Sequence, residues 1–136
     1  MTRLHFQPIR GRALDIIGAI LQTEELASAA EVQRAIHLAT EELVVNIVDY
    51  AYPDRDDGYL DVEIIRNEEY ITLRFHDGGI PFNPLESETP DTSLPMEQRE
   101  IGGLGIFFVL KKMDTVAYEY IHGENLLTIR KKLIKK

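Results

Sequence analysis

The chain has 136 residues, a length typical of one domain, and 44% of them are hydrophobic, which is enough for one buried core. It contains no cysteine, so disulfide bonds, thiolate zinc sites and cysteine nucleophiles are excluded. The formal net charge of -8 disfavours binding to nucleic acid, and the basic run RKKLIKK at residues 130–136 reads as a solvated end of a strand. No apolar stretch is long enough to span a membrane, and no signal peptide is recognisable, so we expect a soluble, cytoplasmic protein.

The first half of the chain predicts one strand and two helices. Residues 3–8 alternate apolar and polar side chains, which is typical of a short strand. Apolar residues recur at helical spacing in residues 12–22, and again over residues 28–52. Ser28 and Glu31 have the spacing of a capping box, so we expect the longer helix to begin there.

The second half predicts four strands and one further helix. The alternating runs YLDVEIIRN and YITLRFHD indicate an antiparallel hairpin. The next 26 residues, 78–103, contain four prolines and no sustained period, which in a compact domain points to a functional lid. The order of elements predicts an α+β fold with a layer of helices on a mostly antiparallel sheet. The remaining helix and two strands are expected at residues 102–114, 115–121 and 125–134.

Three glycines, Gly102, Gly103 and Gly105, stand where the last helix is expected to begin. Glycine permits close approach of the backbone, and a helix N-terminus offers free N–H groups and the positive end of the helix dipole, which favours phosphate. An ordinary glycine-rich turn is the structural alternative. Two other phosphate motifs are excluded, because the lysine of the P-loop is missing and the dinucleotide fingerprint needs a glycine where Phe108 stands.

Glu42 and Asn46, in TEELVVNIVDYAY, lie four residues apart and therefore share one face of the predicted helix. Asparagine is unfavourable inside a helix, and an amide among apolar residues needs hydrogen-bond partners. The structural alternative is that the two side chains bond each other or a turn. The functional alternative is that they hold a base and a ligand for magnesium, which prefers oxygen donors.

Asp77 stands at the end of the predicted hairpin and is followed by two glycines, in FHDGGIPFNP. An Asp-Gly turn is the common structural reason for this pattern. The functional reading is a carboxylate that accepts a hydrogen bond from the amine of a ligand.

Taken together, Glu42-x-x-x-Asn46 on a helix, Asp77-x-Gly79 after a strand, a lid, and Gly102-Gly103-Leu104-Gly105 opening a helix resemble a set of ATP-binding boxes. The superfamily with these boxes contains gyrase, histidine kinases and mismatch-repair ATPases. Within it, the chain is similar to the small anti-sigma-factor serine kinases of bacteria, over nearly its whole length. The resemblance implies a Bergerat-type ATP-binding fold, which is an α+β, two-layer sandwich of helices on a mostly antiparallel mixed sheet. It also implies a single domain, 1–136, with an ATP lid at about 84–101.

The resemblance implies roles for the residues of the first two boxes. Glu42 would be the general base that activates an acceptor hydroxyl, and Asn46 would ligate magnesium. Asp77 would receive the exocyclic amine of adenine, and Gly79 would let the base approach.

The remaining implied roles concern the lid and the last strand. Backbone N–H groups in the run formed by Gly102, Gly103, Leu104 and Gly105 would bind the phosphates of ATP. Thr128 would support the adenine site through a water molecule. Arg99 is the only arginine or lysine between Arg74 and Lys111, so it is the lid candidate for contacting the terminal phosphate or a partner; a solvated arginine is the alternative.

The function implied by the resemblance is that of an ATP- and magnesium-dependent serine/threonine protein kinase acting as an anti-sigma factor. Its partners would be a sigma factor and a small anti-anti-sigma protein that carries the acceptor serine. One alternative is a nucleotide-gated binding module that sequesters a partner with little or no phosphotransfer. The catalytic domain of a histidine kinase is disfavoured, because no helix pair with a phosphoacceptor histidine is recognisable. The sequence leaves open which sigma factor is bound and whether the chain forms a homodimer.

Overall fold

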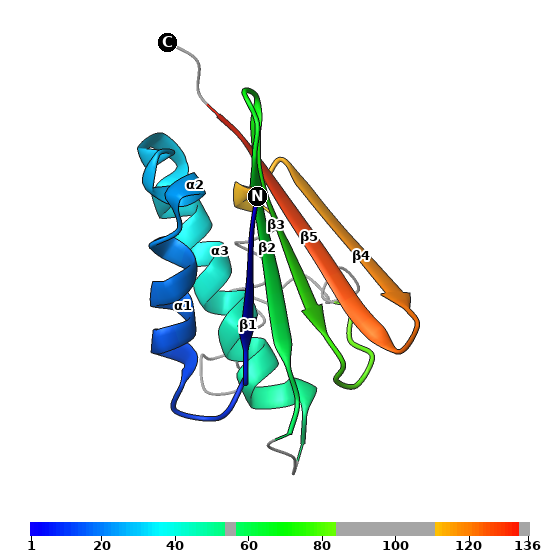
Figure 1. Cartoon of the computed structure of the whole chain (residues 1–136). Coiled ribbons are helices and arrows are strands. Elements are labelled where there is room, and N and C mark those ends of the chain that lie inside the picture. Colours follow the sequence, from blue (N-terminus) through cyan, green and yellow to red (C-terminus); the bar gives the residue numbers. More distant parts are fainter. Residues whose placement is uncertain (54–56, 84–110, 134–136) are drawn as a thin grey trace, which may run out of the picture.

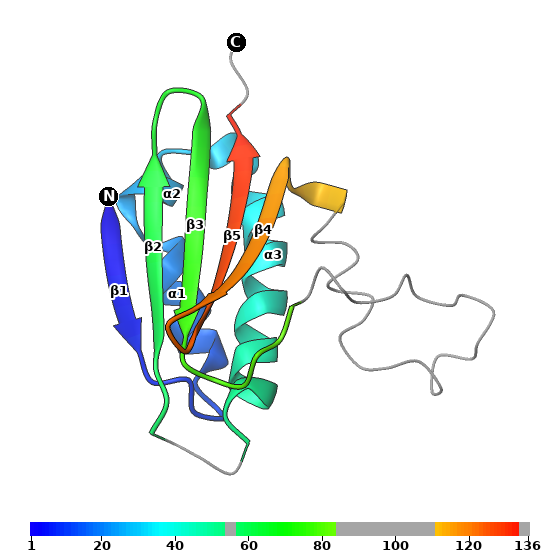
Figure 2. The same cartoon turned by 90° about the vertical axis from the view of Figure 1, so that its right-hand side faces the viewer.

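A computed structural model describes residues 1–53, 57–83 and 111–133. Within these ranges, helical segments cover one face of a five-stranded sheet, as Figures 1 and 2 show. The strand order is β1-β2-β3-β5-β4, and all four pairings are antiparallel. The predicted α+β class, with helices layered on the sheet, is therefore confirmed. In chain order, the elements are β1 (Thr2–Phe6), α1 (Ala13–Leu21), α2 (Glu24–Ala27), η1 (Ala30–Val32), α3 (Gln33–Asn46), η2 (Ile47–Ala51), β2 (Leu60–Arg66), β3 (Tyr70–Asp77), β4 (Thr115–Ile121) and β5 (Glu124–Lys132).

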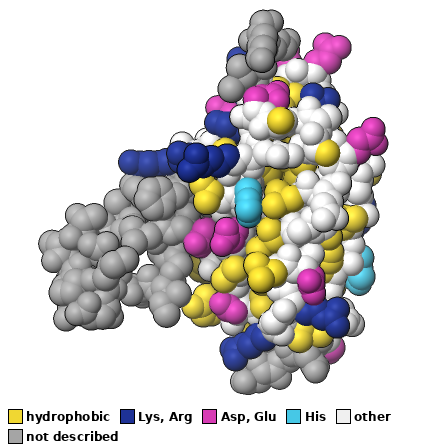
Figure 3. Space-filling model, turned by 90° about the vertical axis from the view of Figure 1, so that its left-hand side faces the viewer, with side chains coloured by type: hydrophobic (Ala, Val, Ile, Leu, Met, Phe, Trp, Pro, Cys, Tyr) yellow, Lys and Arg dark blue, Asp and Glu magenta, His cyan; other side chains and the backbone are white. Residues whose placement is uncertain are grey.

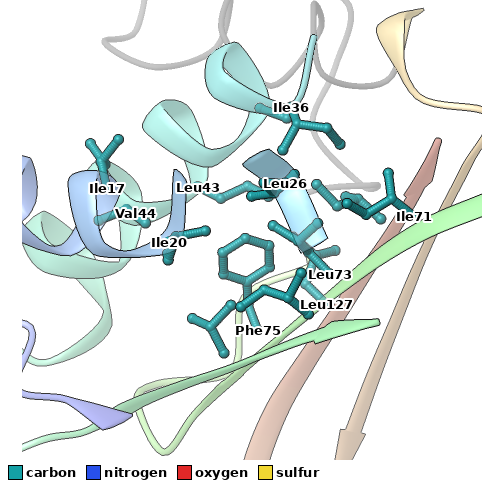
Figure 4. Close-up of a cluster of buried hydrophobic side chains, with 14 of the residues drawn as sticks. Ile17, Ile20, Leu26, Ile36, Leu43, Val44, Ile71, Leu73, Phe75 and Leu127 are labelled. Atoms are coloured by element: carbon teal, nitrogen blue, oxygen red, sulfur yellow. The ribbon is translucent and has the colours of Figure 1, made fainter. Parts of the chain in front are cut away.

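The hydrophobic core lies between the helices and the sheet. Alternate residues of β3 face it, and Leu73 and Phe75 are at most 1% exposed. Figure 4 shows the Phe75 ring between side chains from the helices, such as Ile20, and side chains from the strands. Full burial of a side chain of this size contributes roughly 1.5–3 kcal/mol. Because a shift of one residue would turn the apolar face of β3 to the solvent, the core also fixes the register of the strands.

The entrance to the long helix differs from the prediction. α3 begins at Gln33, its N-cap residue is Val32, and no side chain caps it. The hydroxyl of Ser28 instead donates to the Glu25 carbonyl at 3.2 Å, so the predicted capping box is wrong. The physical reason is that the apolar side chains buried before α3 recur at every third residue. This spacing suits the tight 3₁₀ turn that precedes α3. The buried residues with this spacing are Leu26, Ala29 and Val32.

The outer surface of the helix layer carries an apolar band flanked by charged side chains, as Figure 3 shows. Leu14 on α1 is 82% exposed, and Leu38 on α3 is 47% exposed. In the ranges that the structure describes, no helix has both the length and the apolar character needed to cross a bilayer.

Candidate functional site

Asp77 ends β3 on the face of the sheet that carries the core. Its register partners are Leu60 on β2 and Asn125 on β5, and it is only 6% exposed. One carboxylate oxygen, Oδ1, accepts two hydrogen bonds at 3.0 Å, from the backbone amide of Gly79 and from Asn125 Nδ2. The other oxygen, Oδ2, accepts no hydrogen bond from any residue in the described ranges. Asp77 therefore keeps one acceptor for a further donor.

Burial also sets the protonation behaviour of Asp77. Removal from water raises the pKa of its carboxyl group, and the negative charge of Glu124 adds to this effect. The hydrogen bonds from Asn125 and Gly79 act in the opposite direction. A buried carboxyl group with a raised pKa and a spare oxygen at the end of a strand is a candidate functional residue.

The loop after β3 packs against the end of the helical segment η2, and Figure 2 shows it leaving β3 and running beside the helices. The amide of Ile80 donates to the carbonyl of Ala51 at 2.9 Å, and the amide of Gly78 donates to the Tyr52 hydroxyl at 2.6 Å. A Cβ atom at Gly79 would lie 2.6 Å from the Ala51 Cβ and closer still to its carbonyl oxygen. Close packing against Ala51 therefore requires glycine at position 79, whether or not a ligand also approaches there.

Glu42 and Asn46 lie on α3, and both are half-buried. Neither side chain makes a hydrogen bond to another described residue, so the alternative that they bond each other is not found in this part of the chain. Burial raises the pKa of the Glu42 carboxyl group, and its neighbour Glu41 raises it further. The two polar groups are thus available for a ligand.

The helical segment places these groups in a line that ends at the β3 loop. Asn46 is the last residue of α3, and η2 continues from it as a π-helix to Ala51, which contacts the loop. With a rise of about 1.5 Å per residue, Glu42 and Ala51 are separated by roughly 13 Å along the helix axis. Asn46 lies between them. The loop that follows Asp77 therefore lies at one end of this helical segment, and Glu42 lies at the other end.

Asn125 is a site residue that the sequence did not reveal. It is 5% exposed at the start of β5, and its Nδ2 donates to Asp77 Oδ1 and to the carbonyl of Ile80, at 3.0 and 2.9 Å. Its Oδ1 accepts from the amide of Phe82 at 3.2 Å and from the hydroxyl of Tyr118. The sequence does contain a signal for Asn125. Asparagine is rare in strands, and Asn125 is in phase with the two buried apolar positions Leu127 and Ile129 of β5.

The structure does not place Thr128 beside Asp77. Its neighbours Leu127 and Ile129 face the core, so Thr128 lies on the opposite face of the sheet, where its register partner on β3 is Arg74. The other expected site residues, together with the lid at about 84–101, lie outside the described residues. They are Arg99, Gly102, Gly103, Leu104 and Gly105.

Comparison with known proteins identifies relatives. A family model described as the histidine kinase-like ATPase domain matches residues 8–131. The serine-protein kinase RsbW of Listeria monocytogenes is 30% identical over 97 residues, which cover 68% of this chain and 61% of that protein. RsbW of Oceanobacillus iheyensis is 28% identical over 93 residues, 65% of this chain and 58% of that protein. The chain therefore spans about three fifths of the length of these relatives.

Two further comparisons extend the range of relatives. The serine/threonine-protein kinase BtrW of Bordetella bronchiseptica is 21% identical over 101 residues, which cover 74% of this chain and 71% of that protein. The solved structure of the histidine kinase AdeS from Acinetobacter baumannii superposes with a TM-score of 0.53 at 12% identity. This match covers 99% of the chain and 69% of AdeS, and at such low identity it shows a shared fold.

Proposed function

Because the chain belongs to the histidine kinase-like ATPase domain family, we propose that it binds ATP and transfers the terminal phosphoryl group to a serine or threonine of a partner protein. The observation that carries this proposal is the arrangement around Asp77. A buried carboxylate with one oxygen held and one oxygen spare lies beside the end of the helical segment that carries Asn46 and Glu42. This order suits a nucleotide, with the base at Asp77 and the phosphates farther along the helix.

Asp77 would recognise the base. Its spare oxygen can accept a hydrogen bond from the exocyclic amine of adenine, and its low exposure limits competition from water for this bond. Thr128 lies on the other face of the sheet, so we do not include it in the adenine site.

Asn46 would hold magnesium. Its half-buried amide has no hydrogen bond to other described residues, and an amide oxygen is a suitable donor. No cluster of three or more histidine or acidic side chains able to bind a metal is present among the residues described. Magnesium that binds with nucleotide needs only one or two protein ligands, because water and phosphate oxygens supply the rest. When bound, it would neutralise negative charge on the phosphates.

Glu42 would act as the general base. Its raised pKa makes the carboxylate a stronger proton acceptor than an exposed glutamate. The acceptor hydroxyl oxygen would form a bond to the terminal phosphorus of ATP as the bond between that phosphorus and ADP breaks. The hydroxyl proton would pass to Glu42. The glycine run at residues 102–105 would bind the phosphates, and Arg99 is the lid candidate.

The partners follow from the resemblance to anti-sigma-factor kinases and from relatives named serine-protein kinases. We propose that the chain acts in the cytoplasm, sequesters a sigma factor, and phosphorylates a small anti-anti-sigma protein on a serine. A homodimer would be compatible with this role. The alternative is a nucleotide-gated binding module with little or no phosphotransfer, for which the same residues would bind ATP without Glu42 acting as a base.

Single-turnover transfer of labelled phosphate to a small anti-anti-sigma domain tests the proposal. Glu42→Gln keeps the size of the side chain and removes its basicity, so transfer should fall roughly 100- to 10,000-fold while ATP affinity stays near the wild-type value. Glu41→Gln is the matched control, because that side chain is 54% exposed and should tolerate the same change with most of the activity kept. Transfer by Glu42→Gln at the wild-type rate would show that the base lies elsewhere. A wild-type protein that binds ATP but phosphorylates no candidate would favour the binding module.

A further inference from the structure

We propose that Asn125 is a positioning residue that sets the base selectivity of the site, by holding one oxygen of Asp77 inside the protein so that the other must meet the ligand. This inference rests on the proposed nucleotide binding, and it adds a residue on β5 that no sequence motif supplied. It concerns the choice between adenine, which carries an amine on C6 of the purine ring, and guanine, which carries a keto oxygen on C6.

The orientation of the Asn125 amide is determined by its neighbours. Its nitrogen faces three acceptors, and its oxygen faces two donors. A flipped amide would bring its oxygen against a carboxylate and two carbonyls, and its N–H groups against an N–H donor, so only one orientation satisfies the contacts. The acceptors are Asp77 Oδ1, the Ile80 carbonyl at 2.9 Å and the Gly79 carbonyl at 3.4 Å; the donors are the Phe82 amide and the Tyr118 hydroxyl.

This fixed amide restricts Asp77 in turn. Oδ1 accepts from both Asn125 and the Gly79 amide, so rotation of the carboxylate would break two hydrogen bonds inside the protein. Oδ2 is left as an acceptor without a partner among the described residues. The amine on C6 of adenine matches this oxygen, whereas the keto oxygen on C6 of guanine in the same place would set two acceptors against each other.

Loss of the Asn125 donor should therefore weaken discrimination. The hydrogen bond from Asn125 opposes the effect of burial on the pKa of Asp77, so without it the carboxyl group is protonated more readily. A protonated carboxyl group can donate to a keto oxygen as well as accept from an amine. The carboxylate is also less restrained, because only the bond from the Gly79 amide then holds Oδ1.

Asn125 additionally holds the backbone of the loop after β3, so a test must separate the bond to Asp77 from general support of the loop. Asn125→Thr and Asn125→Val form a matched pair, because both side chains have the same shape and both lose the contacts to the loop. Only threonine keeps a hydroxyl that can donate to Asp77. Ile129→Val, in the core on the same strand and the same face, controls for mild destabilisation of β5.

The measurement is calorimetric titration of each protein with ADP and with GDP in the presence of magnesium, read as the ratio of the two affinities. The wild type should prefer ADP by at least about tenfold, because an unmatched buried hydrogen bond costs about 1–3 kcal/mol. Asn125→Thr and Ile129→Val should keep most of this preference, and Asn125→Val should lose nearly all of it. Overall affinity can fall in both Asn125 variants without affecting the ratio.

The outcomes separate this inference from the proposed function. A wild-type ratio in Asn125→Val, or an equal loss in the threonine and valine variants, would overturn the role of Asn125 while nucleotide binding stands. A wild type that binds neither ADP nor GDP would overturn both proposals. If the valine variant does not fold, Asn125→Ala removes the same donor with a smaller side chain, and a wild-type ratio in that variant would likewise overturn the inference.

Discussion

The carbonyl oxygen of Ala51 accepts a hydrogen bond from the amide of Ile80 at 2.9 Å, which joins the end of the long helical segment to the loop after β3. The two residues are far apart in the chain, and their contact brings the Asp77 loop to the helix that carries Glu42 and Asn46. The geometry of the candidate site therefore depends on close packing between one loop and one helix end.

Gly79→Ala tests this packing directly. The new Cβ atom would lie 2.6 Å from the Ala51 Cβ, so the loop or the helix end must shift, and we expect a loss of about 1–3 kcal/mol in the free energy of unfolding. Urea denaturation measures the change. Gly18→Ala in α1 is the control: apart from the adjoining residues and backbone of its own helix, no described atom lies within 4 Å of the new Cβ, and alanine should stabilise a helix interior by up to about 1 kcal/mol. Equal stability of Gly79→Ala and the wild type would show that the loop or the helix end can move to accept a Cβ atom at little cost in free energy.

Tyr52→Phe tests the second link between helix end and loop. The Tyr52 hydroxyl donates to the Tyr59 carbonyl at 2.6 Å and accepts from the amides of Tyr59 and Gly78. Phenylalanine would remove all three bonds in a side chain that is 9% exposed, so unfolding should become easier by about 1–3 kcal/mol. Tyr50→Phe, at a side chain that is 52% exposed, should change stability by less than about 0.5 kcal/mol. Similar effects of both variants in thermal unfolding would argue against a structural role for the Tyr52 hydroxyl.

The position of several candidate residues in the fold could be predicted, because the signals for it are local. The alternation in β3 ends at Asp77, and the spacing of Glu42 and Asn46 places them on one helix face wherever the helix lies. These patterns need only the chain within a few residues. The α+β class follows from the same kind of information, since the order of helical and alternating runs was readable throughout the described ranges.

The remainder depends on contacts between distant residues. Asn125 and Asp77 are 48 positions apart, and only the register of β3 against β5 makes them partners. Thr128 lies three positions after Asn125 on the same strand, and an odd offset reverses the face of the sheet. The capping box failed for a related reason, because burial of apolar side chains before α3 outweighed the local capping preference of Ser28.

The raised pKa of Asp77 predicts a pH dependence that distinguishes binding from stability. The deprotonated carboxylate is the stronger acceptor for the adenine amine, so ADP affinity should fall as pH is lowered through the pKa of Asp77 in the folded protein, which lies above the usual value of 3.8. The folded state takes up this proton before the unfolded state does. The contribution of Asp77 to stability is therefore fully present below 3.8 and is lost as pH rises through the folded pKa.

Asp77→Asn is the comparison for this pH dependence. At neutral pH it should bind ADP about tenfold or more weakly, because an N–H donor replaces the spare acceptor, yet it should be at least as stable because no charge is buried. Its remaining affinity should not follow the pH profile of the wild type. Calorimetric titrations over a pH series, with unfolding measured in parallel, give both quantities. A wild-type affinity that is constant down to acid unfolding would rule out Asp77 as the acceptor for the base.

Asn46→Ala tests the proposed magnesium ligand, and stability and function should move in opposite directions. Asn46 is half-buried at the junction of α3 and η2 without a hydrogen bond to described residues, so alanine, the better helix former, should stabilise the fold by up to about 0.7 kcal/mol. Magnesium-ATP affinity and phosphotransfer should nevertheless decrease, and excess magnesium should partly restore both. Asp77→Asn is the matched control, because its defect lies at the base and excess magnesium should leave it unchanged. If Asn46→Ala instead shows the magnesium dependence of the wild type, the metal is held by other groups and the half-buried amide needs a different explanation.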